Sequence, residues 1–310
     1  MSNLSLDQLD TANACHDDDP ARAAELLRSV DPAELPPERW PGLAFLLNHV
    51  FGEKLGLPAE AHAMFGPLLS AAGSHPPLAL WRQAAAAAQL AGDSAAARRL
   101  SDSLATAASA SAPTTQDVVA LTAAMYRAPA ADAAEVADAV LPALQAVQAS
   151  AWEAPHPLDS AVAACANNIA ASLQERSQSD LAQGALRAAL DLAAQTAERF
   201  WLRAGTWVHY ERAAYGRATA ATALGEPHRA RHHALRALAL LDEHDLEKAE
   251  NVDRAFIELE LAHACRHLGL AEEARKAQAN ADTLAANFND AGLDAWFAKR
   301  GADLAAMTRR

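Results

Sequence analysis

Histidine pairs four residues apart are the closest this sequence comes to the spacing of metal ligands. His263 and His267 flank Cys265, and His228 and His232 repeat the spacing. Histidines at positions i and i+4 share one face of a helix, where both rings can reach one ion. A structural zinc site needs four ligands, and no nearby segment offers a second pair. We therefore expect these histidines on solvated helix faces, with no metal, no cofactor and no metal requirement for folding.

Acidic and cysteine residues give no stronger chemical signal. The acidic run at residues 17 to 19 lacks the remainder of a calcium-binding loop, so it predicts a solvated turn that caps the next helix. The three cysteines, Cys15, Cys165 and Cys265, are far apart and odd in number. This spacing predicts reduced, buried thiols and no disulfide framework.

Signatures of nucleophilic, nucleotide-dependent and zinc-dependent catalysis are absent from the sequence. It contains no GxSxG, CGSCW, GxxxxGKS or HExxH segment, and no GxGxxG segment after a predicted strand. Enzyme activity is therefore not expected.

Charge and hydropathy exclude two classes of partner. The formal net charge of −13 opposes general binding to nucleic acid and leaves room only for a local basic face. The N-terminal residues show no basic segment followed by an apolar core, and no run of about 18 apolar residues occurs. We expect a cytoplasmic protein that binds neither nucleic acid nor membrane.

The local charge changes sign in the C-terminal half of the chain. Residues 199 to 236 contain seven arginines against Glu211 and Glu226, whereas residues 237 to 290 contain 12 acidic and five basic residues. A solvated surface explains either segment alone. The reversal between adjacent segments also predicts a dipolar surface that steers a charged ligand.

Five aromatic residues lie close together in the same region, and two interpretations remain open for them. They supply bulk where alanine is too small to fill the space between long helices, or they form a binding centre. We expect Trp201 and Trp207 in the core and Tyr215 in a groove. The five are Phe200, Trp201, Trp207, Tyr210 and Tyr215.

The elements that position these residues are predicted to be helices. Alanine is the dominant residue, only 5% of residues are aromatic, and no run alternates with the period of a strand. A repeat punctuates the helices: a small or polar residue ends one helix, and a small residue follows five positions later in the next. The pairs are Asp18 and Ala23, Gly56 and Ala61, Gly92 and Ala97, Ala128 and Ala133, Ser177 and Ala182, Gly225 and Ala230, and Gly269 and Ala274.

The repeat has a direct physical meaning. Glycine ends the first helix of a pair by adopting a left-handed backbone, and the small residue lets the second helix lie close. Successive pairs are 36 to 38 residues apart at first and 44 to 49 residues apart later, so the later helices should be longer. Pro67 and Pro142 fall inside proposed helices, where we expect a kink or an early stop.

These residues resemble the tetratricopeptide repeat. The third hairpin carries the pattern best, with Trp81, Ala85, Gly92 and Ala97, and the fifth resembles the variety with paired asparagines, Asn167 and Asn168. The resemblance implies an all-α fold, a right-handed α-solenoid of about seven antiparallel helical hairpins. Close helix contacts are expected at Ala85, Ala97, Ala182 and Ala218.

Two further expectations concern a helix at the end of the chain and a boundary in its middle. Leu293, Trp296, Phe297 and Leu304 have helical spacing and predict a C-terminal helix that caps the last hairpin. We place one sub-array at residues 1 to 150 and a second, with longer helices, at residues 151 to 310. The break between them is expected at about residues 149 to 159.

The resemblance also implies a site, because the first helices of such hairpins line a concave groove. By register this set includes Arg82 and Gln89 in the third hairpin and His267 in the seventh, and the local arginine excess adds Arg203. Asparagine can hold both the N–H and the C=O of an extended peptide, and Arg212 can bind a carboxylate. The expected peptide-binding residues are Asn167, Gln174, Arg203, Arg212, Tyr215, Thr219 and His263.

Three functions remain open at this point. The resemblance implies a non-enzymatic scaffold or adaptor that binds another protein or peptide, with an acidic segment or a free C-terminal carboxylate as the expected ligand. The alternative is a ligand- or peptide-sensing regulatory module, which predicts a compact pocket. An enzyme or metal protein is the third. Partner identity and oligomeric state do not follow from the sequence.

Overall fold

The computed structural model of this chain describes residues 4–150, 152–247 and 249–308. Every regular element in these ranges is a helix, which confirms the all-α prediction for the described residues. None of the described helices has both the length and the apolar character that spanning a bilayer requires. The chain divides into two compact units, residues 1–153 and 154–310. Residue 151, where the second sub-array is expected to begin, lies outside the described residues, as do the first three and last two positions.

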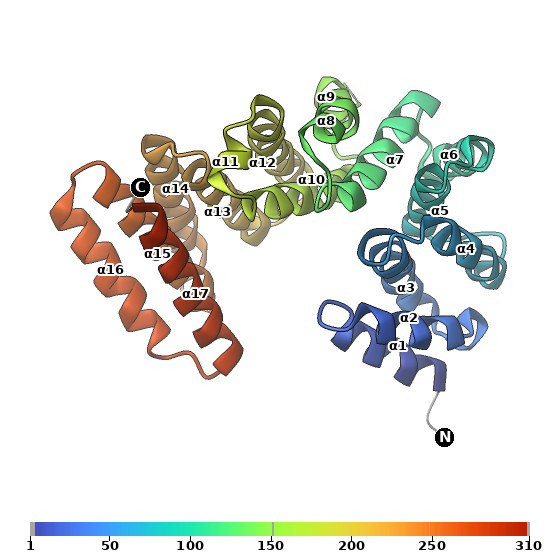
Figure 1. The fold of residues 1–310 in the computed structure, drawn as a ribbon, viewed down its shortest axis with the longest axis horizontal. Helices are drawn as coiled ribbons and strands as arrows, with labels where there is room; N and C mark the ends of the chain where they lie inside the picture. The colour runs from blue at the N-terminus through green and yellow to red at the C-terminus, as the bar shows by residue number, and fades with distance from the viewer. Residues whose placement is uncertain (1–3, 151, 248, 309–310) are drawn as a thin grey trace. The chain divides into compact units, whose positions relative to one another are not determined.

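The first unit consists of short helices that pack in adjacent pairs (Figure 1). α1 packs on α2, η3 on α4, α5 on α6, and α7 on α9. Each pair also contacts the next along the chain. The elements are α1 (Leu4–Cys15), α2 (Pro20–Ser29), the 3₁₀ turns η1 (Pro32–Glu34) and η2 (Pro37–Arg39), α3 (Trp40–Leu46), the π-helical η3 (Leu47–Lys54), α4 (Pro58–Ala72), α5 (Leu78–Leu90), α6 (Ser94–Ala108), α7 (Ala112–Arg127), α8 (Ala133–Glu135), the π-helical η4 (Val136–Val140) and α9 (Leu141–Ala149).

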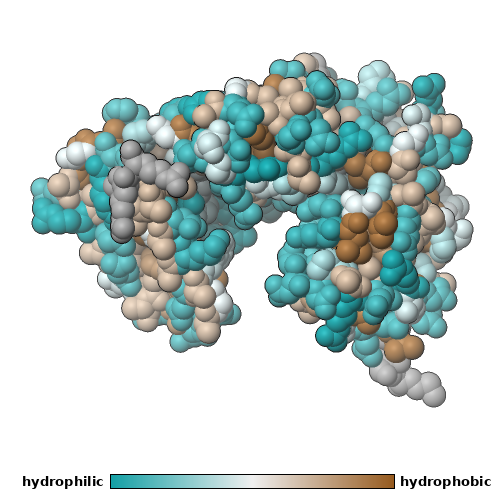
Figure 2. Space-filling model, viewed as in Figure 1, coloured by the Kyte–Doolittle hydropathy of each residue, from teal (hydrophilic) through white to brown (hydrophobic). Residues whose placement is uncertain are grey.

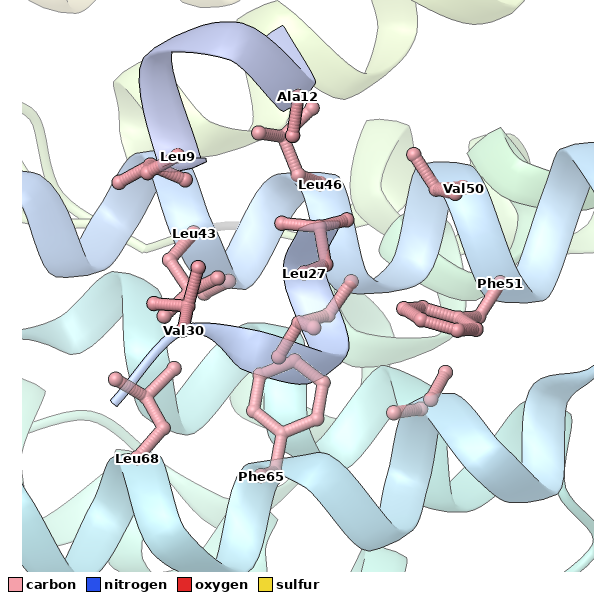
Figure 3. Close-up of a cluster of buried hydrophobic side chains, with 14 of the residues drawn as sticks. Leu9, Ala12, Leu27, Val30, Leu43, Leu46, Val50, Phe51, Phe65 and Leu68 are labelled. Atoms are coloured by element: carbon pink, nitrogen blue, oxygen red, sulfur yellow. The ribbon is translucent and has the colours of Figure 1, made fainter. Parts of the chain in front are cut away.

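A leucine- and phenylalanine-rich core holds the first pairs of this unit together. Leu9 of α1, Leu27 of α2, Leu46 of α3 and Phe65 of α4 belong to one cluster, and each is at most 2% exposed (Figure 3). Burial of a side chain of this size contributes about 1.5–3 kcal/mol. Of the two outcomes expected at Pro67, a kink or an early stop, the early stop does not occur, because α4 continues to Ala72.

The second unit has longer helices, in agreement with the wider spacing of its turn residues. α10 packs on α12, α13 on α14 and α15 on α16, and α17 contacts α15. Successive pairs again contact each other. The elements are α10 (Asp159–Gln174), α11 (Gln178–Leu181), α12 (Gly184–Ala204), α13 (Trp207–Ala223), α14 (Pro227–His244), α15 (Asn251–His267), α16 (Ala271–Ala285) and α17 (Ala291–Thr308).

The turns inside the pairs contain the glycines that the repeat predicts. Gly92 lies between α5 and α6 with φ of +80°, and Gly225 lies between α13 and α14 with φ of +70°. A residue with a β-carbon is strained in this left-handed conformation, so glycine allows the chain to leave one helix and enter the next. Asp19, at the end of the acidic run, caps α2 by accepting a hydrogen bond from the Arg22 N–H, as predicted.

The fifth pair departs from the predicted pattern. Ala182 caps the end of the short α11 and is exposed, so its expected place at a close helix contact is wrong. Gln183 has an extended backbone and α12 begins only at Gly184, which changes the helical phase of the residues that follow. The fully buried small residues of α12 are Ala189 and Ala193 instead.

Buried alanines form much of the core of the second unit. Ala214, Ala218, Ala234 and Ala237 are fully buried in one cluster with larger side chains such as Ile257. Small side chains allow two helix backbones to approach closely, and each contributes little apolar area. Hydrophilic residues cover most of the visible face of each unit, with apolar residues in small patches (Figure 2).

Candidate binding cavity

The second unit contains a cavity of about 1150 Å³. Its walls come mainly from α10, α13, α15 and α17, which are the first helices of three successive pairs and the C-terminal helix. A first helix recurs at the same place in each pair, so residues distant in sequence reach one hollow. The sequence register therefore decides which side chains of α10, α13 and α15 face it.

Six of the seven residues expected in the binding site lie in the lining of this cavity. They are Asn167 and Gln174 on α10, Arg212, Tyr215 and Thr219 on α13, and His263 on α15. His267 also lines it, whereas Arg82 and Gln89 belong to the first unit and do not. The structure thus brings most of the expected residues together.

Arg203, the seventh expected residue, is not part of the lining of this cavity. It lies near the end of α12, where its Nε is 3.1 Å from Oδ2 of Asp159, a fully buried residue at the start of α10. A buried carboxylate requires a cationic partner. Arg203 therefore stabilises the packing of α10 and α12.

Polar side chains without intramolecular partners face the cavity. Within the described residues, the amides of Asn167 and Gln174 and the hydroxyl of Tyr215 make no hydrogen bond. Asn167 is exposed, and the other two are half-buried. An amide offers both a donor and an acceptor, as a peptide group does. These three groups can therefore hold the polar backbone of a bound segment.

Arg212 is already paired with carboxylates of the neighbouring pair of helices. Its Nε donates to Oδ2 of Asp253 at 2.8 Å, and its Nη2 lies 3.3 Å from Oε2 of Glu250. The hydrogen bond to Asp253 raises the pKa of the Arg212 guanidinium further above its usual value. A ligand carboxylate would have to compete with two charges that the protein itself supplies.

Other arginines of the segment 199 to 236 are paired in the same way. Arg231 binds Glu273 of the acidic segment at 2.7 Å, and Arg217, only 8% exposed, lies 3.1 Å from Asp191. Arg229 and Arg236 form ion pairs as well, with Asp191 and Glu198. Of these four arginines, only Arg231 pairs with the acidic segment; the other three pair with acids of α12.

A buried acid lies next to Arg212 in the sequence, behind the lining. Glu211 is fully buried, and neither of its carboxylate oxygens has a hydrogen-bond partner among the described residues. Burial, followed by the charge of Asp253, raises the pKa of Glu211 to about 8. Glu211 therefore keeps its proton at neutral pH. No pattern in the sequence predicts this burial, because acids on a helix usually face water.

His263 is buried and not, as expected, on a solvated helix face. It is 5% exposed, and its ring centroid lies 4.5 Å from that of His267. Burial, and then the charge of His267, lowers the pKa of His263 to about 4. A neutral imidazole therefore forms part of the cavity wall at physiological pH.

The C-terminal helix supplies an aromatic edge of the cavity that sequence reasoning missed. Trp296 of α17 is 56% exposed, and its ring centroid lies 4.5 Å from that of the buried Phe256 of α15. Trp296 was expected to cap the last hairpin. Leu304 does so, because it is 1% exposed and packs on Leu259 and Ala281. The helical spacing of the apolar residues of α17 predicted a buried face. It did not predict that Trp296 would remain exposed.

A buried ion pair fixes α17 against α15 beside this edge. Arg300 Nε donates to Oε1 of the fully buried Glu260 at 2.5 Å, and Thr222 Oγ1 donates to Oε2 at 2.9 Å. Removing one partner of such a pair leaves an uncompensated buried charge, which costs about 3–5 kcal/mol. The position of Trp296 therefore depends on contacts in the core.

Comparisons with known proteins add no relative: no protein-family model and no curated protein matches this chain. The geometry of the cavity carries the functional argument.

Proposed function

We propose that this protein is a non-enzymatic binding module that holds a peptide, or an extended segment of another protein, in the cavity of the second unit. The observation that carries the proposal is the set of lining side chains that have no hydrogen-bond partner among the described residues, Asn167, Gln174 and Tyr215, in the same cavity as the exposed Trp296. Amides and hydroxyls can bind peptide backbone, and a partly exposed tryptophan is a frequent anchor at binding centres.

The size of the cavity favours a peptide over a small metabolite. Its volume of about 1150 Å³ exceeds the range of roughly 300–1,000 Å³ that is typical of small-molecule pockets. Several residues of a peptide can fill such a space, with one apolar side chain against Trp296 and Phe256.

The hydroxyl groups of the lining support a non-enzymatic role. Thr219 donates to the Gly216 carbonyl, Thr222 donates to Glu260, and Ser177 caps α11 and bonds Asp180. A nucleophilic hydroxyl needs a hydrogen bond to a base that is free to take its proton. These three hydroxyls serve the fold instead.

The ligand that we propose is not selected by its charge. The sequence favours an acidic peptide or a free C-terminal carboxylate, but Arg212 and Arg300 both have carboxylate partners within the protein. An acidic ligand has to displace one of these partners before it gains an ion pair. We therefore expect affinity to depend on backbone hydrogen bonds and on the aromatic anchor.

The tetratricopeptide-type arrangement belongs to this proposal as well. Pairs of helices stack in order along each unit, and glycines with positive φ lie in turns between paired helices. A right-handed solenoid capped by α17 would place the first helices on one concave side, where the cavity residues of α10, α13 and α15 lie.

A peptide library provides the direct test. Peptides are selected on the full chain, and their dissociation constants are measured by fluorescence anisotropy for the wild type and for Asn167→Ala combined with Gln174→Ala. We expect the double variant to bind roughly 10-fold more weakly, because each neutral hydrogen bond contributes about 0.5–1.5 kcal/mol. Neither side chain makes a hydrogen bond to another described residue, so the fold should not change.

Asn168→Ala is the matched control. Asn168 is the next residue of α10 and has the same side chain, but it does not line the cavity. Equal losses in the control and the double variant would contradict the proposal, as would selected peptides that bind both variants as tightly as the wild type.

One observation favours the sensing module as a second candidate. α17 both borders the cavity and packs on α15, so a ligand that contacts Trp296 acts on the last helix of the chain. Hydrogen exchange of α17 with and without a selected peptide tests this. Slower hydrogen exchange throughout α17 would support the sensing module. Unchanged exchange would favour the scaffold.

A further inference from the structure

Two histidines and an aspartate meet in the first unit, remote in sequence from the cavity residues. His16 and Asp17 lie in the turn between α1 and α2, and His49 lies on the π-helical η3. Oδ2 of Asp17 is 3.4 Å from Nε2 of His16, and its Oδ1 is 3.5 Å from Nε2 of His49. One ligand atom from each residue lies within 4.8 Å of the other two.

Hydrogen bonds determine which nitrogen of each ring faces this cluster. Nδ1 of His16 lies 2.6 Å from the Asn13 carbonyl, and Nδ1 of His49 lies 2.9 Å from Oε2 of Glu53. A carbonyl and an ionised carboxylate only accept hydrogen bonds, so each Nδ1 carries the proton. In the neutral rings both Nε2 lone pairs therefore point toward the Asp17 carboxylate. Three electron-rich groups face one another, and the Lys54 ammonium, 2.9 Å from Oδ1 of Asp17, supplies the positive charge that such a cluster requires.

The surroundings hold these groups in position. Asp19, two residues after Asp17, caps α2, and its own N–H bonds the Cys15 carbonyl at 2.8 Å, so the turn is fixed at both ends. The ring of Phe45 stacks on His49 with centroids 5.2 Å apart and planes inclined by 14°. π-helical segments occur frequently at functional sites. The cluster is built from fixed elements, although its atoms remain accessible to solvent.

We propose that His16, Asp17 and His49 bind a divalent transition-metal ion, with zinc as the matching ion. Zinc bonds to histidine nitrogen and carboxylate oxygen are roughly 2.0–2.2 Å long, and tetrahedral angles then place two ligand atoms about 3.4 Å apart. Each histidine Nε2 lies at about this edge length from one oxygen of Asp17, Oδ2 for His16 and Oδ1 for His49. One ligand atom from each residue lies within 4.8 Å of the others, so the side chains have to draw closer to bind one ion. Water takes the fourth position. Glu53 and the Asn13 carbonyl act as positioning groups that orient the rings, in the way that ligating histidines are usually supported.

Lys54 provides a built-in competitor for the ion. Its Nζ lies 2.9 Å from Oδ1 of Asp17, so the ammonium occupies the side of the carboxylate that the ion would share. An ion that binds has to displace this ammonium. Replacing Lys54 with an uncharged residue should therefore tighten metal binding, an effect that a merely structural cluster would not show.

Metal titration of the full chain tests the proposal. Chelated and dialysed protein is titrated with Zn²⁺ by calorimetry at pH 7.5, and with Co²⁺ by visible absorption, in which tetrahedral sites absorb more strongly than six-coordinate ones. We expect one ion per chain, with binding at least roughly 10-fold weaker in His16→Gln and His49→Gln. Glu53→Gln should weaken it by about 10- to 100-fold, and Lys54→Met should tighten it.

The matched control is His228→Gln combined with His232→Gln, which removes an exposed histidine pair on α14. Circular dichroism checks that each variant folds, and Asp17→Asn in the exposed turn replaces any histidine variant that does not. The proposal is overturned by absence of binding at millimolar Zn²⁺, by unchanged affinity in the ligand variants, by loss in the control, or by unchanged or weaker binding in Lys54→Met.

Discussion

The guanidinium of Arg212 and the carboxylate of Asp253 bind each other across two helices, with Nε 2.8 Å from Oδ2. The two residues are 41 positions apart and lie on α13 and α15, both in the wall of the cavity. The pair joins the basic segment of the sequence to the acidic segment that follows it. At this position, the charge reversal between the two segments forms an internal ion pair, and its charges are not free to attract a ligand.

The first prediction concerns Asp253→Asn. The substitution removes the stronger partner of Arg212 and leaves only Glu250 beside its Nη2, so the Nε side of the guanidinium becomes available to a ligand carboxylate. We expect selected peptides with a free C-terminal carboxylate to bind the variant more tightly than their amidated forms, by about 1.5–3 kcal/mol, as is typical of charged hydrogen bonds. The preference should decrease with added salt. Anisotropy titrations of both peptide forms measure it.

In the wild type we expect the two peptide forms to bind about equally. A strong preference of the wild type for the free carboxylate would show that Arg212 leaves Asp253 when a ligand binds, and it would restore the acidic ligand expected from the sequence.

The second prediction concerns the pH dependence of stability. The pKa of Glu211 is about 8 in the folded protein and 4.5 as its ordinary value. Between these values the unfolded chain has lost the proton that the folded chain keeps, so the free energy of unfolding decreases as pH rises. The stabilisation that comes from the raised pKa of Glu211 is fully present below pH 4.5 and is lost by about pH 8. Glu211→Gln removes it.

We therefore expect Glu211→Gln to gain stability relative to the wild type between pH 5 and pH 8, by about 3 kcal/mol. Denaturant unfolding at the two pH values measures the difference. Glu243→Gln is the control, because Glu243 is an exposed residue of α14. Parallel pH profiles for Glu211→Gln and the wild type would mean that Glu211 is ionised at neutral pH.

The third prediction compares two alanines that the repeat pattern treats alike. Ala218 is fully buried in the alanine-rich cluster, whereas Ala182 is exposed at the end of α11. Ala218→Leu should overpack the contact between α13 and its neighbours and lower the free energy of unfolding by about 1–3 kcal/mol. Ala182→Leu should change it by less than about 0.5 kcal/mol. Chemical denaturation distinguishes the two, and equal effects would contradict the assigned packing.

The sequence alone was sufficient for the helices and for most of their turns. Alanine content and the absence of strand periodicity determine the all-α class, because both reflect local preferences of the chain. Gly92 and Gly225 were identifiable as turn residues for the same reason, since a left-handed backbone favours glycine regardless of tertiary contacts. The resemblance to the tetratricopeptide repeat implied that Asn167 and Tyr215 face one groove, and both line one cavity.

Only the tertiary structure decided which charges are free and which residues from distant segments meet. Arg203 and Arg212 both belong to the arginine-rich segment of the sequence, yet the first lies against a buried aspartate and the second against two acids of the next pair. His49 joins His16 through the packing of η3 near the α1–α2 turn, 33 residues away. Ion pairs and ligand sets depend on distances in space, and local sequence periodicity carries no information about them.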